Sequence, residues 1–80
     1  MIKWIVDTDH YGPPVYKGIR NNVLCFCIVK NMVSDGYWLR SYLTDYKKTI
    51  KVSDIDIAKD KADFLFKIWL DMMKLKSNTL

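Results

Sequence analysis

One long amphipathic helix, expected over residues 53–75, constrains the fold of this chain more than any other feature. When these residues are projected at about 100° each, one apolar face contains Ala58, Ala62, Leu65, Phe66, Trp69, Met72 and Met73. Further apolar residues flank this face: Ile57, Phe64, Ile68 and Leu75 form a second stripe, and Leu70 lies on the other side. The apolar arc spans roughly two thirds of the circumference, whereas a helix on a single sheet usually presents a stripe of about 100°. Part of the helix is therefore expected to bind something beyond the segment that precedes it.

The length of 80 residues predicts a single domain, with a strand-rich part at 1–52, a helix at 53–76 and a frayed tail at 77–80. A chain this short buries only about 60 to 65% of its unfolded surface, so its core gives little stability and association would help it. Half of the residues are apolar, which excludes a disordered chain. We therefore expect a packed globule that associates with itself or with a partner.

The sequence favours a cytoplasmic protein, in the host cell cytoplasm, without membrane contact. The longest apolar run covers residues 23–29, far fewer than the roughly 20 residues that span a bilayer, and no signal-peptide pattern is present. Cys25 and Cys27 stand two apart in a predicted strand, where their side chains are expected on the same side, about 6 to 7 Å apart, and unpaired. With His10 as the single histidine, no zinc site and no cofactor are expected.

Alternating and continuous apolar segments predict strands at 2–6, 15–20, 23–30, 37–44 and, as a short edge strand, 49–52. The 23–30 strand is apolar on both faces, which is typical of a central strand covered twice. Asn21-Asn22 suits a two-residue hairpin turn, Gly18 predicts a bulge or a close approach, and Ser53 is expected to cap the helix. The predicted fold is α+β: a small antiparallel sheet of three to five strands packed on one long C-terminal helix.

The alternation of side chains along strands predicts an aromatic surface. If Leu24, Phe26 and Ile28 face the helix, Cys25 and Cys27 face away from it. The next strand would then place Trp38, Arg40 and Tyr42 on that outer face. These side chains either cover small neighbours by ordinary cross-strand pairing, anchor a protein interface, or stack the bases of a single-stranded nucleic acid.

The basic residues favour an acidic partner. The whole net charge of +4 comes from residues 1–52, since residues 53–80 contain five Lys and five Asp. A nucleic-acid surface, as an alternative to protein binding, would use Arg40, Tyr42, Tyr46, Lys47, Lys48 and Lys51. The charge is modest and the chain has only two arginines, so a solvated face or an acidic protein fits as well.

Catalysis has little support in the sequence, and we expect a protein that is not an enzyme. Asp7, Asp9 and His10 could together hold a divalent metal or transfer protons. No second cluster completes such a site: the chain has no glutamate, no nucleophile elbow and no phosphate-binding glycine loop. A polar turn is the simpler interpretation, and no metal site is predicted.

The order of several short patterns resembles small, uncharacterised phage and prophage accessory proteins. The patterns are an early Trp4 strand, Tyr16-Lys17-Gly18, Tyr37-Trp38-Leu39 and a closing helix with Ala58-Lys59 and Ala62. In those proteins a few strands precede a serine-capped helix of the type S-x-x-x-A-K-x-x-A. This chain departs from that type by one residue between Ser53 and Ala58. The resemblance implies a non-catalytic protein, and the class includes inhibitors of host enzymes or defence systems that act by covering a surface.

The function expected from the sequence is a non-catalytic binding protein of a phage or mobile element that inhibits a bacterial defence or host protein. The predicted partner-binding residues are Trp38, Arg40, Tyr42, Phe64, Ile68 and Leu75. A homodimer is also expected, with either Phe64, Ile68 and Leu75 or Trp38 and Tyr42 at the contact. The nucleic-acid-binding accessory protein is the alternative function, and a small metal-dependent enzyme is the third.

Overall fold

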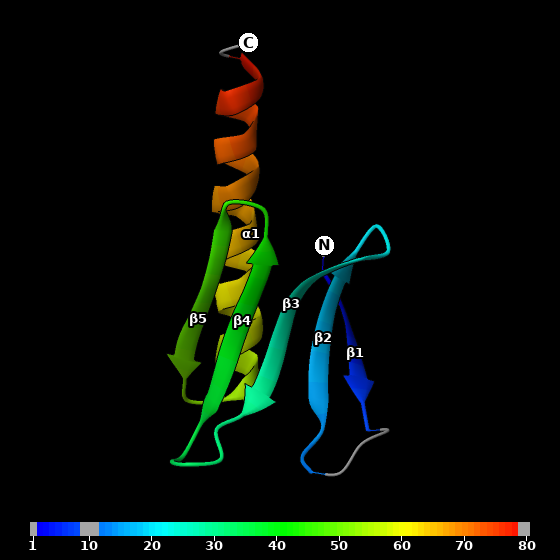
Figure 1. The fold of residues 1–80 in the computed structure, drawn as a ribbon, viewed down its shortest axis with the longest axis vertical. Helices are drawn as coiled ribbons and strands as arrows, with labels where there is room; N and C mark the ends of the chain where they lie inside the picture. Colours follow the sequence, from blue (N-terminus) through cyan, green and yellow to red (C-terminus); the bar gives the residue numbers. More distant parts are fainter. Residues whose placement is uncertain (1, 9–11, 79–80) are drawn as a thin grey trace.

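The chain forms a five-stranded antiparallel sheet followed by one helix. The computed structural model describes residues 2–8 and 12–78, with side chains as far as Lys74. The elements, in chain order, are β1 (Lys3–Asp7), β2 (Val15–Arg20), β3 (Val23–Lys30), β4 (Tyr37–Leu43), β5 (Tyr46–Val52) and α1 (Ile55–Asn78). Each strand pairs with its neighbours in sequence, and α1 runs across one face of β3, β4 and β5 (Figure 1). The predicted α+β architecture is confirmed.

Two tight turns set the register of the hairpins. Asn21 and Asn22 both have positive φ angles, 52° and 62°, as the two central positions of the favoured hairpin turn require. This turn was predicted. Asp45 also has a positive φ, 61°, and ends a second two-residue turn, so that pairing resumes directly between Leu43 and Tyr46. As a result, β5 begins three residues before the predicted edge strand and pairs along its whole length with β4.

A bulge in β3 changes the predicted faces of its side chains. Gly18 pairs with Phe26 and Ile19 with Leu24, so Cys25 is an extra residue on β3. Cys25 therefore joins Phe26 in the core on the helix side, while Leu24 is 40% exposed. The expectation that Leu24 faces the helix, and that both cysteines share the outer face, was wrong because strict alternation fails at a bulge.

The glycine of β2 is required by the packing beside this bulge. A Cβ atom on Gly18 would lie 2.9 Å from Ile2 and from the indole of Trp4, well inside normal contact. These two side chains cross the strand at this point and pack against the core. The predicted close approach at Gly18 is confirmed, and so is the bulge next to it.

The core lies between α1 and the three strands β3, β4 and β5. Phe26, Ile28 and Leu39 are fully buried in the sheet, and Ala58 and Ala62 are fully buried in the helix. The two small alanine side chains allow α1 to lie close to the sheet. β3 is the central strand, as predicted, but within the described residues no second layer covers its other face.

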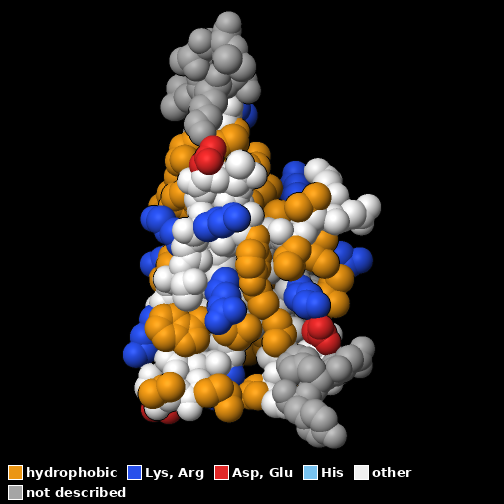
Figure 2. Space-filling view, in the orientation of Figure 1, with side chains coloured by type: hydrophobic (Ala, Val, Ile, Leu, Met, Phe, Trp, Pro, Cys, Tyr) orange, Lys and Arg blue, Asp and Glu red, His pale blue; other side chains and the backbone are white. Residues whose placement is uncertain are grey.

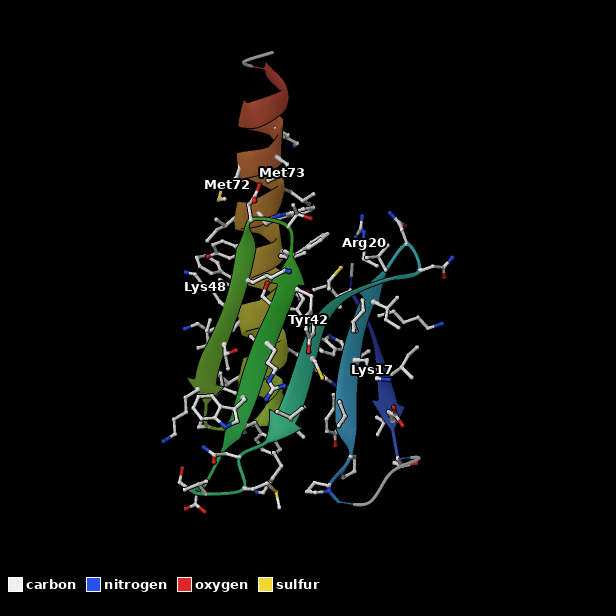
Figure 3. All side chains as sticks on the ribbon, viewed as in Figure 1. Lys17, Arg20, Tyr42, Lys48, Met72 and Met73 are labelled. Carbon is white, nitrogen blue, oxygen red and sulfur yellow. The ribbon has the colours of Figure 1, made fainter. Side chains whose placement is uncertain are left out.

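α1 begins at Ile55, two residues after the predicted start at residue 53, and ends at Asn78, two residues into the predicted frayed tail, so that it extends past the sheet. Asp54, rather than Ser53, caps it: the backbone N–H of Ile57 donates to Asp54 Oδ1 at 2.8 Å. The 24 residues of α1 correspond to about 36 Å, whereas a seven-residue strand spans about 23 Å. The helix therefore continues beyond the β4–β5 turn (Figure 1), where Met72 and Met73 are only partly buried (Figure 3).

Candidate binding surface on the sheet

The face of the sheet that points away from α1 is called the outer face below. In β4 and β5, the register brings three cross-strand pairs to this face: Trp38 with Lys51, Arg40 with Thr49 and Tyr42 with Lys47. Tyr42 is 42% exposed, Arg40 is exposed and Trp38 is half-buried. The structure thus brings Trp38, Arg40 and Tyr42 together on one uncovered surface, where the alternation of the strand had placed them.

The basic residues proposed as a nucleic-acid surface are divided between two faces. Lys47 and Lys51 lie on the outer face, in line with Tyr42 and Trp38. Tyr46 and Lys48 alternate with them and lie on the helix side, where the Lys48 ammonium is 4.6 Å from the centre of the Tyr46 ring. This division follows from the two-residue period of a strand, because neighbours in sequence point to opposite faces.

The outer face continues across β1 and β2 with apolar and charged side chains. Ile5 pairs with Lys17 there, and Lys17 donates to Asp7 in an ion pair of 2.8 Å between Nζ and Oδ2. The hydrogen bond and the negative charge of Asp7 raise the pKa of Lys17. Beside this pair, Cys27 lies between Lys17 and Arg40, and burial raises the pKa of its thiol.

Positive charge and apolar surface alternate over the whole outer face. Among the described residues, its basic side chains are Lys3, Lys17, Arg40, Lys47 and Lys51, and its strands contribute one carboxylate, that of Asp7. Its aliphatic residues are Ile5, Ile19, Leu24 and Val29. Figure 2 views this face directly and shows blue and orange side chains interspersed across it, with little red. The outer face therefore combines basic side chains, which attract an anionic partner, with apolar side chains, which can form a contact that excludes water.

The loop between β3 and β4 adds an exposed apolar tip that sequence reasoning missed. The buried side chain of Asn31 organises this loop: its Oδ1 accepts from the N–H groups of Val33 and Ser34 at 3.0 and 3.1 Å. Met32 and Val33 are consequently held out in solvent, with Val33 96% exposed. The signal was available in the sequence, because an Asn that bonds to the backbone two or three residues later is a common turn former.

A groove opens next to the Phe26–Ser41 pair, where the pairing of β3 with β4 ends and the two strands separate. It has a volume of about 300 Å³, with Phe66, Trp69 and Leu70 of α1 along one side. Arg20 lies at its rim with its guanidinium 5.4 Å from the centre of the Phe66 ring (Figure 3). Cys25 also lines the groove, and burial raises the pKa of its thiol. The separation of the strands follows the bulge at Cys25.

The predicted helix residues lie on a different surface from the outer face. Phe64 is 62% exposed and Ile68 is half-buried, both on α1 on the opposite side of the sheet from Trp38. The side chain of Leu75 lies outside the described residues. The six residues predicted to bind a partner therefore do not form one site, because the sheet separates its outer face from the helix.

The remaining sequence hypotheses concern chemistry at the first loop. Asp7 pairs with Lys17, whereas Asp9 and His10 lie outside the described residues. Within residues 2–8 and 12–78, no three His, Cys, Asp or Glu side chains come together in a way that could hold a metal ion. The same part of the chain contains no helix with the length and apolarity that a membrane crossing needs.

Comparison with family models, with curated proteins and with solved structures finds no match to this chain.

Proposed function

We propose that this chain is a non-catalytic binding protein that captures an acidic partner protein on the outer face of its sheet. The observation that supports this most is the row Trp38, Arg40 and Tyr42 along β4, on a face that no other described part of the chain covers. Trp, Tyr and Arg are the residues that most often anchor protein interfaces.

The surroundings of this row support a protein contact rather than a merely solvated face. An antiparallel sheet with one free face usually presents polar residues to water. Here Ile5, Leu24 and Val29 share that face with the aromatic row, and Ile5 and Leu24 are 44% and 40% exposed. Aliphatic and aromatic side chains surrounded by charges match the apolar centre and polar rim of a typical interface.

The basic residues around the aromatic row indicate that the partner carries negative charge. Lys47 and Lys51 lie at the edge strand and Lys17 lies on the other side of the row. A rim of lysines accelerates association with an acidic surface and excludes a basic one, while the anchors in the centre hold the complex together. The exposed loop tip with Met32 and Val33 follows directly from β3 and would extend the contact.

The biological role that fits this mode of action is inhibition by covering a surface. The chain resembles small phage and prophage proteins, some of which inhibit host enzymes or host defence systems. We therefore propose a phage or mobile-element protein that occludes an acidic region of a bacterial target. Such a role requires a rigid scaffold and an exposed binding surface, and it requires no catalytic group.

A nucleic-acid-binding accessory protein is the second candidate, favoured by the pairing of each aromatic ring on the outer face of β4 with a lysine of β5. Tyr42 stands next to Lys47, and Trp38 next to Lys51. Aromatic rings that stack bases, beside cations that contact phosphates, are the usual elements of single-strand binding. It ranks second because Tyr46 and Lys48 point to the other side of β5, and because the aliphatic residues of β1 to β3 have no role in it.

The test uses variants on β4 and β5, and the lysine variants of β5 differ in the face of the sheet that they occupy. Trp38→Ala and Tyr42→Ala remove the anchors, Lys47→Ala with Lys51→Ala removes two rim charges, and Lys48→Ala removes a charge from the helix side. Immobilised wild-type protein is incubated with bacterial lysate, and the captured protein is identified by mass spectrometry and then titrated with every variant. A labelled single-stranded oligonucleotide is titrated in parallel at about 50 and 200 mM salt.

Protein capture predicts that each anchor variant weakens binding about 30-fold or more, since interface anchors contribute 2 kcal/mol or more. The paired lysine variant is expected to slow association at low salt, and Lys48→Ala to leave binding unchanged. Nucleic-acid binding predicts a steep loss of oligonucleotide affinity with salt and a strong dependence on Lys47 and Lys51. Equal effects of Lys48→Ala and the outer-face lysines would contradict both candidates.

A further inference from the structure

The exposed flank of α1 carries a row of two apolar residues between two charged ones, and this row is separate from the outer face of the sheet. The row consists of Lys61, Phe64, Ile68 and Asp71, spaced by three, four and three residues. At about 100° per residue these positions fall within a sector of about 80°, which is the seam of a two-helix coiled coil. We call these four residues the helix seam.

The seam lies on a largely exposed side of α1. Phe64 is 62% exposed, Lys61 and Asp71 are exposed and Ile68 is half-buried. The opposite flank of the helix faces β2, where Arg20 stacks on Phe66. Phe66 is about 160° around the helix from both Phe64 and Ile68. A helix placed against the seam would thus lie beside α1, on the flank turned away from β2, and clear of the groove.

The two charges at the ends of the helix seam, Lys61 and Asp71, need an explanation. Within the part of the chain that the structure describes, neither Lys61 nor Asp71 forms an ion pair. An exposed lysine and an exposed aspartate at seam positions weaken a purely apolar contact, but in coiled coils such residues select the partner and its direction. The pattern of the seam therefore indicates which partner it fits.

We propose that the helix seam binds a second copy of this chain. The two α1 helices are antiparallel, and their two-fold axis lies at the level of Phe66 along the helix, although Phe66 itself is on the other side of α1. The helix rises 1.5 Å per residue, so Phe64 and Ile68 lie about 3 Å to either side of that level, and Lys61 and Asp71 about 7.5 Å to either side. A two-fold axis at this level places Phe64 opposite Ile68 of the other copy and Lys61 opposite Asp71 of the other copy. Each contact occurs twice, and every seam residue has a complementary neighbour.

The same charges disfavour the parallel arrangement. Parallel helices in register would place Lys61 against a second Lys61 and Asp71 against a second Asp71. Like charges that face each other repel and disfavour the alternative, which is how charged seam positions specify orientation. The antiparallel pair turns both repulsions into attractions. The exposed Ile57 lies one heptad before Phe64 and extends the apolar seam toward the N-terminal end of α1.

The pairing is tested by charge reversal, with mass in solution measured by light scattering after gel filtration at high micromolar concentration. Wild-type protein is expected near twice the monomer mass of 9.5 kDa. Lys61→Asp places two aspartates opposite each other at both ends of the seam, and Asp71→Lys does the same with lysines. Each single variant is expected to raise the dissociation constant about tenfold or more, because two favourable pairs become two repulsive ones.

The decisive sample is an equimolar mixture of the two single variants. In a heterodimer, Asp at 61 of one copy faces Lys at 71 of the other, and the two unchanged residues pair at the opposite end, so dimerisation is expected to return to the wild-type level. Asp63→Lys is the matched control, since Asp63 is exposed on α1 but lies about 120° from the middle of the seam, and it should leave the dimer unchanged.

Three results would overturn the pairing. A wild-type protein that stays at 9.5 kDa at high micromolar concentration would leave the seam to a different protein. A mixture that remains monomeric, while each variant keeps its helical circular dichroism, would show that Lys61 and Asp71 do not face each other. A wild-type dimer that survives both single variants and Phe64→Ser would place the contact elsewhere, such as on Trp38 and Tyr42.

Discussion

Trp69 packs at the end of the core nearest the β4–β5 turn, and its removal tests how α1 is attached to the sheet. Its indole Nε1–H donates to the backbone carbonyl of Thr44, in the β4–β5 turn, at 2.8 Å. Its ring also stacks on Phe66 with the centroids 5.8 Å apart and the planes at 24°. Because Trp69 is only partly buried, Trp69→Ala is expected to cost about 3 kcal/mol, the lower end of the range for large aromatic residues.

The conservative variant Trp69→Phe separates the contributions to this loss of stability. Trp69→Phe keeps a ring against Phe66 and loses the hydrogen bond to Thr44, which is worth about 1 kcal/mol. Stacking with Phe66 contributes about another 1 kcal/mol, which only the alanine variant loses. For a domain of this size, each kcal/mol lowers the melting temperature by roughly 4 to 8 °C. The alanine variant should therefore melt roughly 12 to 24 °C below the wild type, and the phenylalanine variant roughly 4 to 8 °C below it.

The assay is thermal and urea unfolding followed by far-ultraviolet circular dichroism, at a low protein concentration so that association does not add to stability. A melting temperature of Trp69→Ala within a few degrees of the wild type would refute the assignment of Trp69 to the core. Equal losses in the alanine and phenylalanine variants would show that the hydrogen bond, rather than the ring, attaches the helix to the turn.

Two further predictions concern the backbone and the thiols. Gly36 and Gly12 both have positive φ angles, 99° and 107°, but a Cβ on Gly36 would lie 2.5 Å from the carbonyl oxygen of Val52, whereas Gly12 has open space. Gly12→Ala is expected to cost about 1 to 3 kcal/mol from strain alone and Gly36→Ala distinctly more, and equal urea midpoints would contradict the packing of this loop on β5. Burial raises the pKa of Cys25 and Cys27, so folding favours their neutral thiols; this stabilisation is complete below the unfolded pKa of about 8.5 and is lost as pH rises through the folded pKa. The fall in unfolding free energy from about pH 8 to pH 10 should be smaller in Cys25→Ala/Cys27→Ala, and an unchanged fall would count against the burial of both thiols.

Much of the fold was predictable because local patterns agree with the tertiary structure. The apolar spacing of residues 53–75 predicted the helix, and Asn21-Asn22 predicted the turn that the φ angles show. The alternation in β4 placed Trp38, Arg40 and Tyr42 on one face, and the pairing with β5 keeps them there. These features depend on the period of a helix or a strand and on which residues tolerate a positive φ, and both are properties of the chain itself.

Only the tertiary structure decided which faces are buried and which residues meet. The bulge at Cys25 reversed the faces of the residues before it, and it lies in β3 beside Gly18 of β2, where the side chains of Ile2 and Trp4 approach the backbone. The sequence showed two apolar stripes on the helix and favoured the wider one, with Leu65 and Trp69, for the core, and this is the stripe that the sheet covers. Packing chose the row with Ala58 and Ala62, since small side chains permit the closest approach. Phe64 remains exposed because the sheet covers only one side of the helix and Phe64 lies outside that side.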